Sequence, residues 1–138
     1  VFSQVPPAWV REFILPHVQA IFAAFPHAVR IYHNEGRHSD EHVAMVAGFG
    51  ADVWHFGSDA HALADLAPKV GDRLVLFGGL DPHGVLRHGT PDEVRAATRQ
   101  ALAEAGGHRL LFSSGTGTTP DTSLENQRAM VQTVAAWS

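Results

Sequence analysis

Hydrophobic positions along the chain follow two spacings, one typical of helices and one typical of buried strands. Apolar side chains in residues 8–25 recur every three or four positions, which predicts an amphipathic helix with Pro16 as a kink. Its expected buried stripe is Trp9, Phe13, Ile14, Val18, Ile21, Phe22 and Phe25. Short runs rich in β-branched and aromatic residues follow, separated by turn residues. The predicted strands are Ala28–Tyr32, Ala51–Phe56, Arg73–Phe77 and Arg109–Ser113.

Starting and ending signals predict a helix after each strand. The clearest is the capping box Thr90-Pro91-Asp92-Glu93, in which proline occupies the first turn. The last helix has Thr122 as its predicted cap, with Glu125 three residues on. The first of these helices is expected to run from Ser39 to about Ala47 and to end at Gly48 and Gly50. The second is expected to start at Ser58 or Asp59 and to end ahead of Pro68. The third is expected to run from Thr90 to Gly106-Gly107, and the fourth from Thr122 towards Trp137.

The predicted order is one helix followed by four strand–helix units. Parallel neighbours need a crossover connection, so this order indicates an α/β fold with a parallel sheet. An open doubly wound sheet and half of a (β/α)₈ barrel both satisfy it. No linker, low-complexity tract or second domain is visible, and residues 1–138 are therefore expected to form a single domain.

Polar and glycine-rich segments follow all four predicted strands. In both architectures ligands bind at the carboxyl ends of the strands, and the opposite ends of these strands are plain turns. The sequence therefore predicts a functional site at this edge. The segments are 33–38, 55–59, 78–83 and 113–117.

His33 and Glu35 are the strongest candidates for chemistry. An imidazole and a carboxylate at a strand end suit a Zn²⁺ ion with an open coordination position, and equally suit a general acid/base pair. His55, at the end of the next strand, would add a third group. The plainer alternatives are that Glu35 caps the following turn and that His55 packs as a half-buried core residue.

Two further segments are candidates for binding a substrate or cofactor. Gly78 and Gly79 allow close backbone approach, and Asp81 would hold an arginine or a substrate hydroxyl, or simply serve as a turn residue before proline. Residues 113–119, including Ser114 and Thr116, offer hydroxyls and N–H groups for an anion. They lack the lysine of a P-loop, so nucleotide binding is not expected.

Composition narrows the function classes. Apolar residues make up 45% and charged residues 17%, which indicates a globular chain, and the net charge of −4 leaves no basic surface for nucleic acid or an anionic membrane. The chain has no cysteine, which excludes thiolate ligands and fits a cytoplasmic protein. No apolar run approaches the length of a membrane span. The chain opens on Val1 rather than methionine, which suggests a processed or fragmentary polypeptide.

Four stretches resemble segments of the uroporphyrinogen decarboxylase superfamily, which includes corrinoid methyltransferases. GGLDPHGVLRHGTPDEVRAATRQAL resembles its "G-N-L-D-P…G-T-P-E-E-V" segment, and FSSGTGTTPDTSLENQRAMVQTV resembles its closing "P-x-T-P-x-E-N" segment. WVREFILPHVQAIFAAF and VRIYHNEG resemble the family's "F-x-E-F-x-x-P" helix and "H-x-C-G" strand end. The resemblance implies the C-terminal half of a (β/α)₈ barrel, with the N-terminal half missing.

Departures from the family pattern bear on chemistry. The resemblance implies a zinc ligand at His33, in a site where methyltransferases of this family use two cysteines. Here Glu35 stands at the first cysteine and Thr116 at the second, so a thiolate site is excluded. Thr116 also stands where the decarboxylases have histidine. A His/carboxylate set is harder and more Lewis acidic than a thiolate set.

The first functional interpretation is therefore an O-demethylase-type methyltransferase that works with a corrinoid carried by a partner protein. The second is a decarboxylase-like carboxy-lyase acting on a tetrapyrrole carboxylate. The third is an inactive half-barrel or binding module. Four strand–helix units leave two unpaired sheet edges, so we expect the chain to form homo-oligomers or to need its other half.

Overall fold

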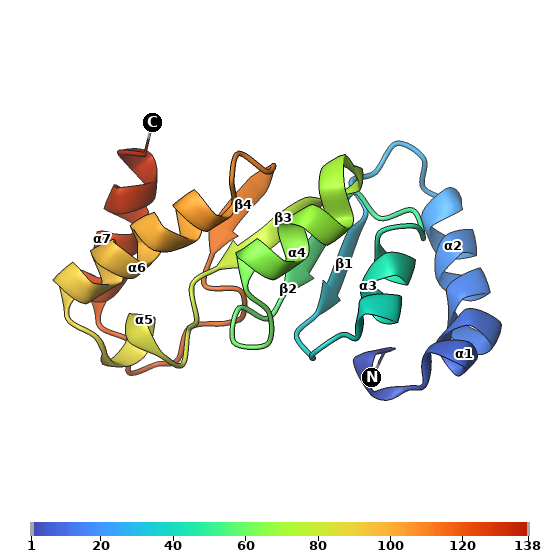
Figure 1. The fold of residues 1–138 in the computed structure, drawn as a ribbon, viewed down its shortest axis with the longest axis horizontal. Coiled ribbons are helices and arrows are strands. Elements are labelled where there is room, and N and C mark those ends of the chain that lie inside the picture. The colour runs from blue at the N-terminus through green and yellow to red at the C-terminus, as the bar shows by residue number, and fades with distance from the viewer. Residues whose placement is uncertain (1, 138) are drawn as a thin grey trace.

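A computed structural model describes residues 2–137 and contains one sheet of four parallel strands in the order β1-β2-β3-β4. The strands are β1 (Ile31–Asn34), β2 (Val53–Phe56), β3 (Val75–Gly79) and β4 (Leu110–Ser113). The helices are α1 (Pro7–Trp9), α2 (Leu15–Ala23), α3 (Asp40–Val46), α4 (Leu63–Val70), α5 (Val85–His88), α6 (Pro91–Glu104) and α7 (Leu124–Ala135). Short 3₁₀ turns cover Phe2–Gln4 and Gly71–Arg73 (Figure 1).

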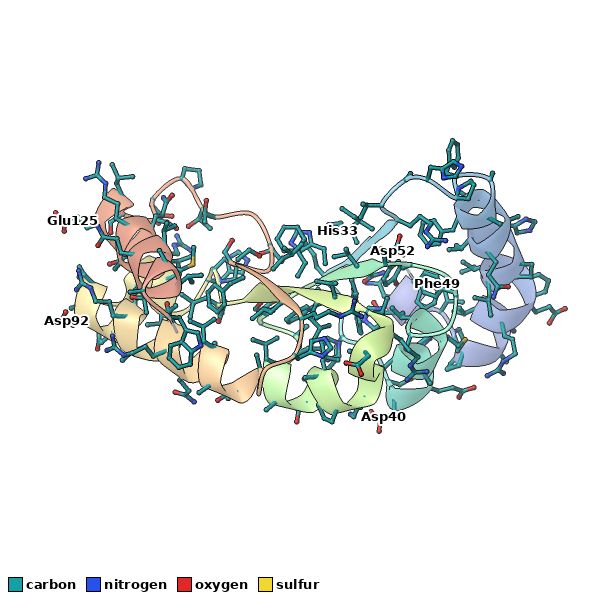
Figure 2. All side chains as sticks on the ribbon, turned by 90° about the horizontal axis from the view of Figure 1, so that it is seen from above. His33, Asp40, Phe49, Asp52, Asp92 and Glu125 are labelled. Atoms are coloured by element: carbon teal, nitrogen blue, oxygen red, sulfur yellow. The ribbon has the colours of Figure 1, made fainter. Side chains whose placement is uncertain are left out.

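The order of the strands decides between the two predicted architectures. A doubly wound sheet reverses its strand order and carries helices on both faces. Here the strands are sequential, and α3, α4 and α6 lie on the same face of the sheet (Figure 2). This arrangement is that of a partial barrel. None of the helices within residues 2–137 is long and apolar enough to cross a membrane.

The core lies between the sheet and this helical layer. Trp54, Phe56 and Leu76 point into it from the middle strands and are fully buried. The opposite face of the sheet is open, because Ile31 is 50% exposed on β1 and Leu111 is 48% exposed on β4. All-parallel sheets are normally covered on both faces. The open face therefore corresponds to the interior of a barrel.

The strands begin later than the sequence pattern predicted. β1 starts at Ile31 rather than Ala28, and β3 covers Val75–Gly79 rather than Arg73–Phe77. At the start of β1 the backbone N–H and the guanidinium of Arg30 both bind the carboxylate of Asp52, at 2.6–2.9 Å. This pair fixes the register just before β1 and β2. With the observed bounds, His33 lies inside β1, and Gly78 and Gly79 lie inside β3.

The N-terminal helical segment differs from the predicted continuous helix. A π-helical turn, Val10–Ile14, separates α1 from α2 and ends two residues before Pro16. Proline has no N–H to donate and its ring crowds the preceding turn, which explains the wider turn there. The predicted buried stripe is only half correct. Ile14, Val18 and Phe22 pack against the core, whereas Trp9, Phe13, Ile21 and Phe25 are more than half exposed.

Two helix boundaries were predicted wrongly. α4 begins at Leu63 rather than Ser58 or Asp59, and it contains Pro68 instead of ending before it. Residues 57–61 form a turn closed on the carbonyl of Gly57, which delays the helix. The apolar face of α4, with Leu63, Leu66 and Val70 buried, holds the helix together through the proline.

The caps of the other helices follow local chemistry. The predicted capping box is confirmed: Thr90 Oγ1 accepts from the Glu93 N–H at 3.3 Å, and the Glu93 carboxylate accepts from the Thr90 N–H at 2.7 Å. Ser39 caps α3 as predicted. α7 is capped by Ser123 rather than Thr122, whose hydroxyl instead pairs with that of Thr119. The short helix α5 was not predicted.

Replacing Asn126 with alanine should destabilise the fold. The buried Asn126 amide donates to the carbonyls of Leu86 (3.0 Å) and Gly89 (2.8 Å), and so ties α7 to α5. Leaving both carbonyls without a donor should lower the free energy of unfolding by about 2 kcal/mol. Urea denaturation measures this, with Gln132→Ala on the exposed side of the same helix as the control. Equal stability of the two variants would contradict this role.

Candidate functional site

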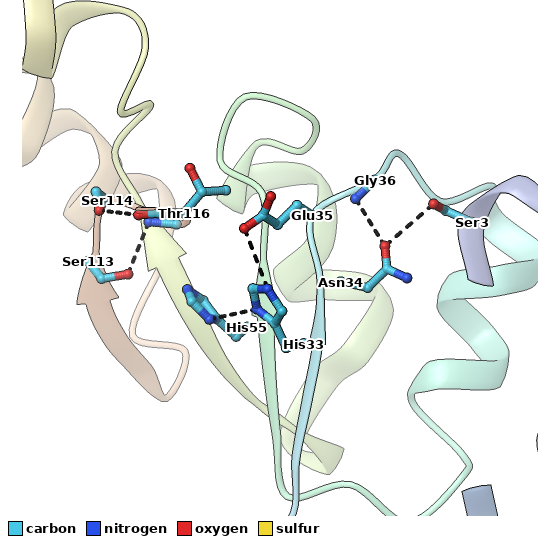
Figure 3. A network of polar contacts seen from close by, with 10 residues as sticks. Ser3, His33, Asn34, Glu35, Gly36, His55, Ser113, Ser114 and Thr116 are labelled. Atoms are coloured by element: carbon cyan, nitrogen blue, oxygen red, sulfur yellow. Dashed lines mark hydrogen bonds and ion pairs between the residues drawn. The ribbon is translucent and has the colours of Figure 1, made fainter. Parts of the chain in front are cut away.

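Two histidines meet on the open face of the sheet. His33 on β1 and His55 on β2 are register partners, so their side chains point to the same face. Their Nδ1 atoms are 2.9 Å apart, which is hydrogen-bonding distance (Figure 3). The His55 ring stacks on Phe77 of β3, with centroids 4.1 Å apart and planes inclined by 20°. A row of side chains therefore crosses three strands.

Glu35 completes a cluster of three predicted site residues. Its Oε1 lies 3.4 Å from His33 Nε2, and the two side chains are 52% and 54% exposed. The turn after β1 is held by Asn34 instead, whose Oδ1 accepts from the Gly36 N–H at 3.0 Å. Glu35 is thus directed at His33. The alternative prediction, that Glu35 caps the turn after β1, is wrong, because Asn34 fills that role.

The electrostatics of the cluster favour a neutral His55. Burial is the main cause that lowers the pKa of His55, and the neighbouring His33 lowers it further. Glu35 and the backbone of Gly115 act in the opposite direction.

The glycines of β3 approach aromatic rings closely. A Cβ on Gly78 would lie 2.6 Å from the ring of Phe56, and one on Gly79 would lie 2.7 Å from the ring of Phe112. The backbone N–H of Gly79 also donates to Ser58 Oγ at 2.8 Å. The close approach predicted from the sequence is thus made within the protein, and the proposed cofactor-binding role of these glycines stays a prediction.

Asp81 lies apart from the histidines. Its carboxylate accepts from the backbone N–H of His83 at 2.8 Å, as expected of a turn residue. It lines a separate pocket with Ser58, His61 and Gln100, between α4 and α6. The structure does not bring Asp81 together with His33, and its catalytic role stays a prediction.

The loop after β4 uses most of its polar groups internally. Ser114 Oγ donates to the Thr116 carbonyl at 2.6 Å, and the Gly115 N–H donates to Ser113 Oγ at 3.0 Å (Figure 3). The Thr116 hydroxyl is buried and has no hydrogen-bond partner among the described residues. The loop does not satisfy this buried hydroxyl, and the cofactor-binding role of Ser114 and Thr116 stays a prediction.

Gly115 should not tolerate a side chain. It has a positive φ of 74°, and a Cβ would meet Ser58 Oγ and, at 2.7 Å, the Ser58 N. Gly115→Ala should therefore lower the free energy of unfolding by about 2 kcal/mol or more. Thermal unfolding measures the loss. Gly117→Ala is the matched control, since a Cβ there would meet nothing within 4 Å, and equal melting temperatures would show that the loop adapts.

A second histidine cluster, which the sequence analysis did not predict, lies beside Tyr32 of β1. The buried His38 ring contacts the Gly36 carbonyl at 2.6 Å through Nδ1 and the Tyr32 hydroxyl at 3.1 Å through Nε2. Its backbone N–H donates to His61 Nε2 at 2.9 Å. His42, also buried, lies between Ser39 Oγ and a backbone carbonyl. The i, i+4 spacing of His38 and His42 was the available signal.

Groups of three or more possible metal ligands are not found within residues 2–137. The pair His33 and Glu35 is therefore the largest set of predicted ligands directed at one point, because His55 turns its Nδ1 to His33. Any further ligands would have to come from solvent, substrate or another polypeptide.

Comparisons with known proteins match nearly the whole chain. The sequence model described as "Uroporphyrinogen decarboxylase (URO-D)" matches residues 3–137. A protein of Dichelobacter nodosus named "Uroporphyrinogen decarboxylase" is 34% identical over 137 residues, covering 94% of this chain and 37% of the relative. One of the same name from Xanthomonas euvesicatoria is 32% identical, covering 96% of this chain and 39% of the relative. The chain thus spans less than two fifths of these relatives.

A solved structure shares the fold. A "methyltransferase from Methanosarcina mazei" matches with a TM-score of 0.79 at 23% identity, over 94% of this chain and 37% of that protein. The match, together with the sequential parallel strands, identifies the fold as a partial (β/α)₈ barrel. The fold class predicted from the sequence is confirmed, and so is the resemblance on which it rested.

Proposed function

Because the chain belongs to the uroporphyrinogen decarboxylase family, we propose that its open sheet face is part of a methyltransferase-type active site in which His33 and Glu35 hold a divalent metal ion. The observation that carries the proposal is the separation of 3.4 Å between His33 Nε2 and Glu35 Oε1. Zinc is the preferred candidate, since it accepts nitrogen and carboxylate ligands without cysteine.

The separation fits two ligands of one ion better than a direct hydrogen bond. Nitrogen–oxygen hydrogen bonds span roughly 2.7–3.2 Å, shorter than the 3.4 Å between these atoms. Two ligands on a tetrahedral zinc, with bonds of about 2.1 Å, lie about 3.4 Å apart. His33 and Glu35 are also about half exposed, so substrate or water can reach the remaining positions.

The floor beside this pair suits an aromatic substrate. Phe77 lies next to His55 across the sheet, and Leu111 follows Phe77 on β4. Both side chains lie on the open face, so an apolar ring can rest on them while a polar atom of the substrate reaches His33 and Glu35. A methyl ether of a phenol combines these two features.

The proposed reaction moves a methyl group from oxygen to a corrinoid. Bound at His33 and Glu35, the metal ion would act as a Lewis acid that polarises the ether oxygen. A corrinoid on a partner protein would supply Co(I) as the methyl acceptor, and the electron pair of the broken methyl–oxygen bond would stay on the oxygen as a phenolate next to His33 and Glu35. As the carboxylate ligand, Glu35 would offset part of the positive charge of the ion.

A second candidate is a carboxy-lyase acting on a tetrapyrrole. It is favoured by the relatives with 32–34% identity, which carry the name uroporphyrinogen decarboxylase. Thr116, where the family resemblance implies histidine in decarboxylases, counts against it. This candidate requires no metal at His33 and Glu35.

Assays of the chain with zinc distinguish the two candidates. With a methoxylated aromatic and Co(I) cobalamin, methyl transfer should produce methylcobalamin, and His33→Ala should abolish it. The exposed His27 provides the control variant His27→Ala, which should retain full activity. Carbon dioxide release from uroporphyrinogen without any dependence on zinc would favour the lyase. Absence of both activities, together with no retained zinc, would reject the methyltransferase proposal.

A further inference from the structure

The exposed apolar side chains of this protein gather at the two ends of the sheet. Among residues 2–137, ten large apolar side chains are exposed: six lie between Trp9 and Ile31, and four lie between Leu111 and Trp137. The elements between these two groups expose none of the ten. Single exposed apolar residues are common on soluble proteins, whereas apolar side chains gathered in patches mark contact surfaces. The two ends are therefore the surfaces that a second polypeptide is expected to cover.

The same two ends lack charged side chains. Residues 13–29 contain no Asp, Glu, Lys or Arg, although most of them are exposed. Residues 129–137, in and after α7, contain none either. The helices between the ends are charged: α3 opens with Asp40 and Glu41, and α6 with Asp92 and Glu93. Depletion of charged residues is typical of the centre of a protein–protein interface, and an exposed helix without charges is not typical of a surface in contact with solvent.

The open edges of the sheet lie at these two ends as well. β1 and β4 each pair with one neighbour only, so each leaves one edge without a strand partner among residues 2–137. α2 lies at the β1 end of the molecule and α7 at the β4 end (Figure 1). Beside β4, an apolar groove of about 260 Å³ is lined by Phe112, Met130, Val131, Val134 and Ala135. Each end therefore combines an open strand edge with an apolar helical surface.

We infer that two copies of this chain join at these ends, so that β4 of each copy lies beside β1 of the other and a closed eight-stranded barrel forms. A typical (β/α)₈ barrel has eight parallel strands and about 250 residues. One copy has four parallel strands and 138 residues. A second copy therefore supplies what the partial barrel lacks, both in strands and in length.

A twofold axis along the strand direction produces this closure. Rotation about such an axis preserves the direction of the strands, so β4 and the β1 of the other copy are parallel, as all neighbours within one copy already are. The same rotation places α7 next to the α2 of the other copy, which covers both apolar surfaces. The two junctions are identical, and no sheet edge stays open. An axis perpendicular to the strands would instead pair like edges and leave the other two uncovered.

Closure of the barrel also encloses the face that carries His33 and Glu35. In one copy these side chains are 54% and 52% exposed, and the second copy supplies the opposite wall. The inference does not rest on the proposed function, because the strand edges and the uncharged apolar ends exist whether or not a metal binds. Its failure would leave the proposed metal site untouched, and failure of the metal site would leave the dimer untouched.

Two variants with opposite charges at the two ends test this arrangement by size-exclusion chromatography with light scattering. The native protein should run at twice the 14.9 kDa of one chain. Phe13 and Val131 are 59% and 60% exposed in one copy, so replacing them leaves its core intact. Phe13→Arg and Val131→Glu should each shift the mass to that of one chain, because each substitution affects both junctions. Ala96→Glu, which adds a charge to the exposed side of α6, is the control and should keep the double mass.

Mixing the two variants gives the decisive result. In a mixed dimer one junction has both native residues, and the other brings the introduced arginine next to the introduced glutamate, so mixing should restore the double mass. Loss of the double mass in only one of the two variants would show that like ends meet, and would overturn the inference. Failure of the mixture to recover would do the same. A native protein with the mass of one chain would also overturn it, and would leave the two ends to a different polypeptide.

Discussion

Lowering the pH from 7 to 5 should reduce the free energy of unfolding by about 2 kcal/mol through His38 alone. His38 is 5% exposed, and burial lowers its pKa to about 4. Its Nδ1–H donates to the Gly36 carbonyl, while Nε2 accepts from the hydroxyl of Tyr32. The buried ring is therefore held in its neutral form.

The direction of the effect follows from the two pKa values. The unfolded chain binds a proton on His38 near pH 6.5, whereas the folded chain does so only near pH 4. Between these values the unfolded state carries more protons, so stability falls as the pH falls and the full loss is about 3 kcal/mol. His61 acts in the same direction, since burial lowers its pKa and its Nε2 accepts from the His38 N–H.

Urea denaturation between pH 4 and 7.5 measures this effect. His38→Gln keeps an acceptor for Tyr32 but cannot titrate, so it should be less stable than the native protein at pH 7 and should depend less on pH. His83 is exposed on the loop after β3, and His83→Gln should reproduce the native profile. A His38→Gln profile as steep as the native one would show that other groups cause the acid sensitivity.

Removing the Glu35 carboxylate should weaken zinc binding by about 100-fold or more. Complete four-ligand zinc sites bind with roughly 10–16 kcal/mol, which is about 3 kcal/mol per ligand, and His33 and Glu35 are the two proposed ligands. Glu35→Ala leaves His33 paired with His55 but removes the facing charge. Glu35→Gln, which keeps an oxygen without the charge, should fall between the native protein and Glu35→Ala.

Isothermal titration with zinc measures the affinities. The control is Glu12→Ala, which removes an exposed carboxylate from the N-terminal helical segment, well outside the cluster. It should bind zinc as the native chain does. Equal affinities of Glu35→Ala and Glu12→Ala would exclude Glu35 as a ligand.

Features determined by neighbouring residues could be predicted from the sequence. The caps at Ser39 and Thr90 were correct, because a capping side chain and its N–H partner lie within three residues of each other. The starts of β1 and β2 were shifted, because the Arg30–Asp52 pair that precedes these two strands joins residues 22 positions apart. Pro68 lies inside α4 because burial of the apolar face of that helix outweighs the local preference to end.

In the site, too, contacts between residues close in sequence could be predicted, and contacts that depend on the fold could not. That His33 and Glu35 face one another was expected from their spacing at a strand end, and the structure brings them together. The contact between the Nδ1 atoms of His33 and His55 depends on the register of β1 and β2, which the pattern of apolar residues does not specify. The buried cluster around His38 was missed because histidines are usually exposed, and only the fold shows that this one is enclosed.

The most direct test of the metal site is X-ray absorption at the zinc edge of the zinc-loaded chain. We expect outer-shell scattering from a single imidazole in a site of nitrogen and oxygen ligands, and loss of that scattering in His33→Ala. A spectrum without imidazole scattering, or one unchanged in His33→Ala, would contradict the assignment of His33 and Glu35 as metal ligands.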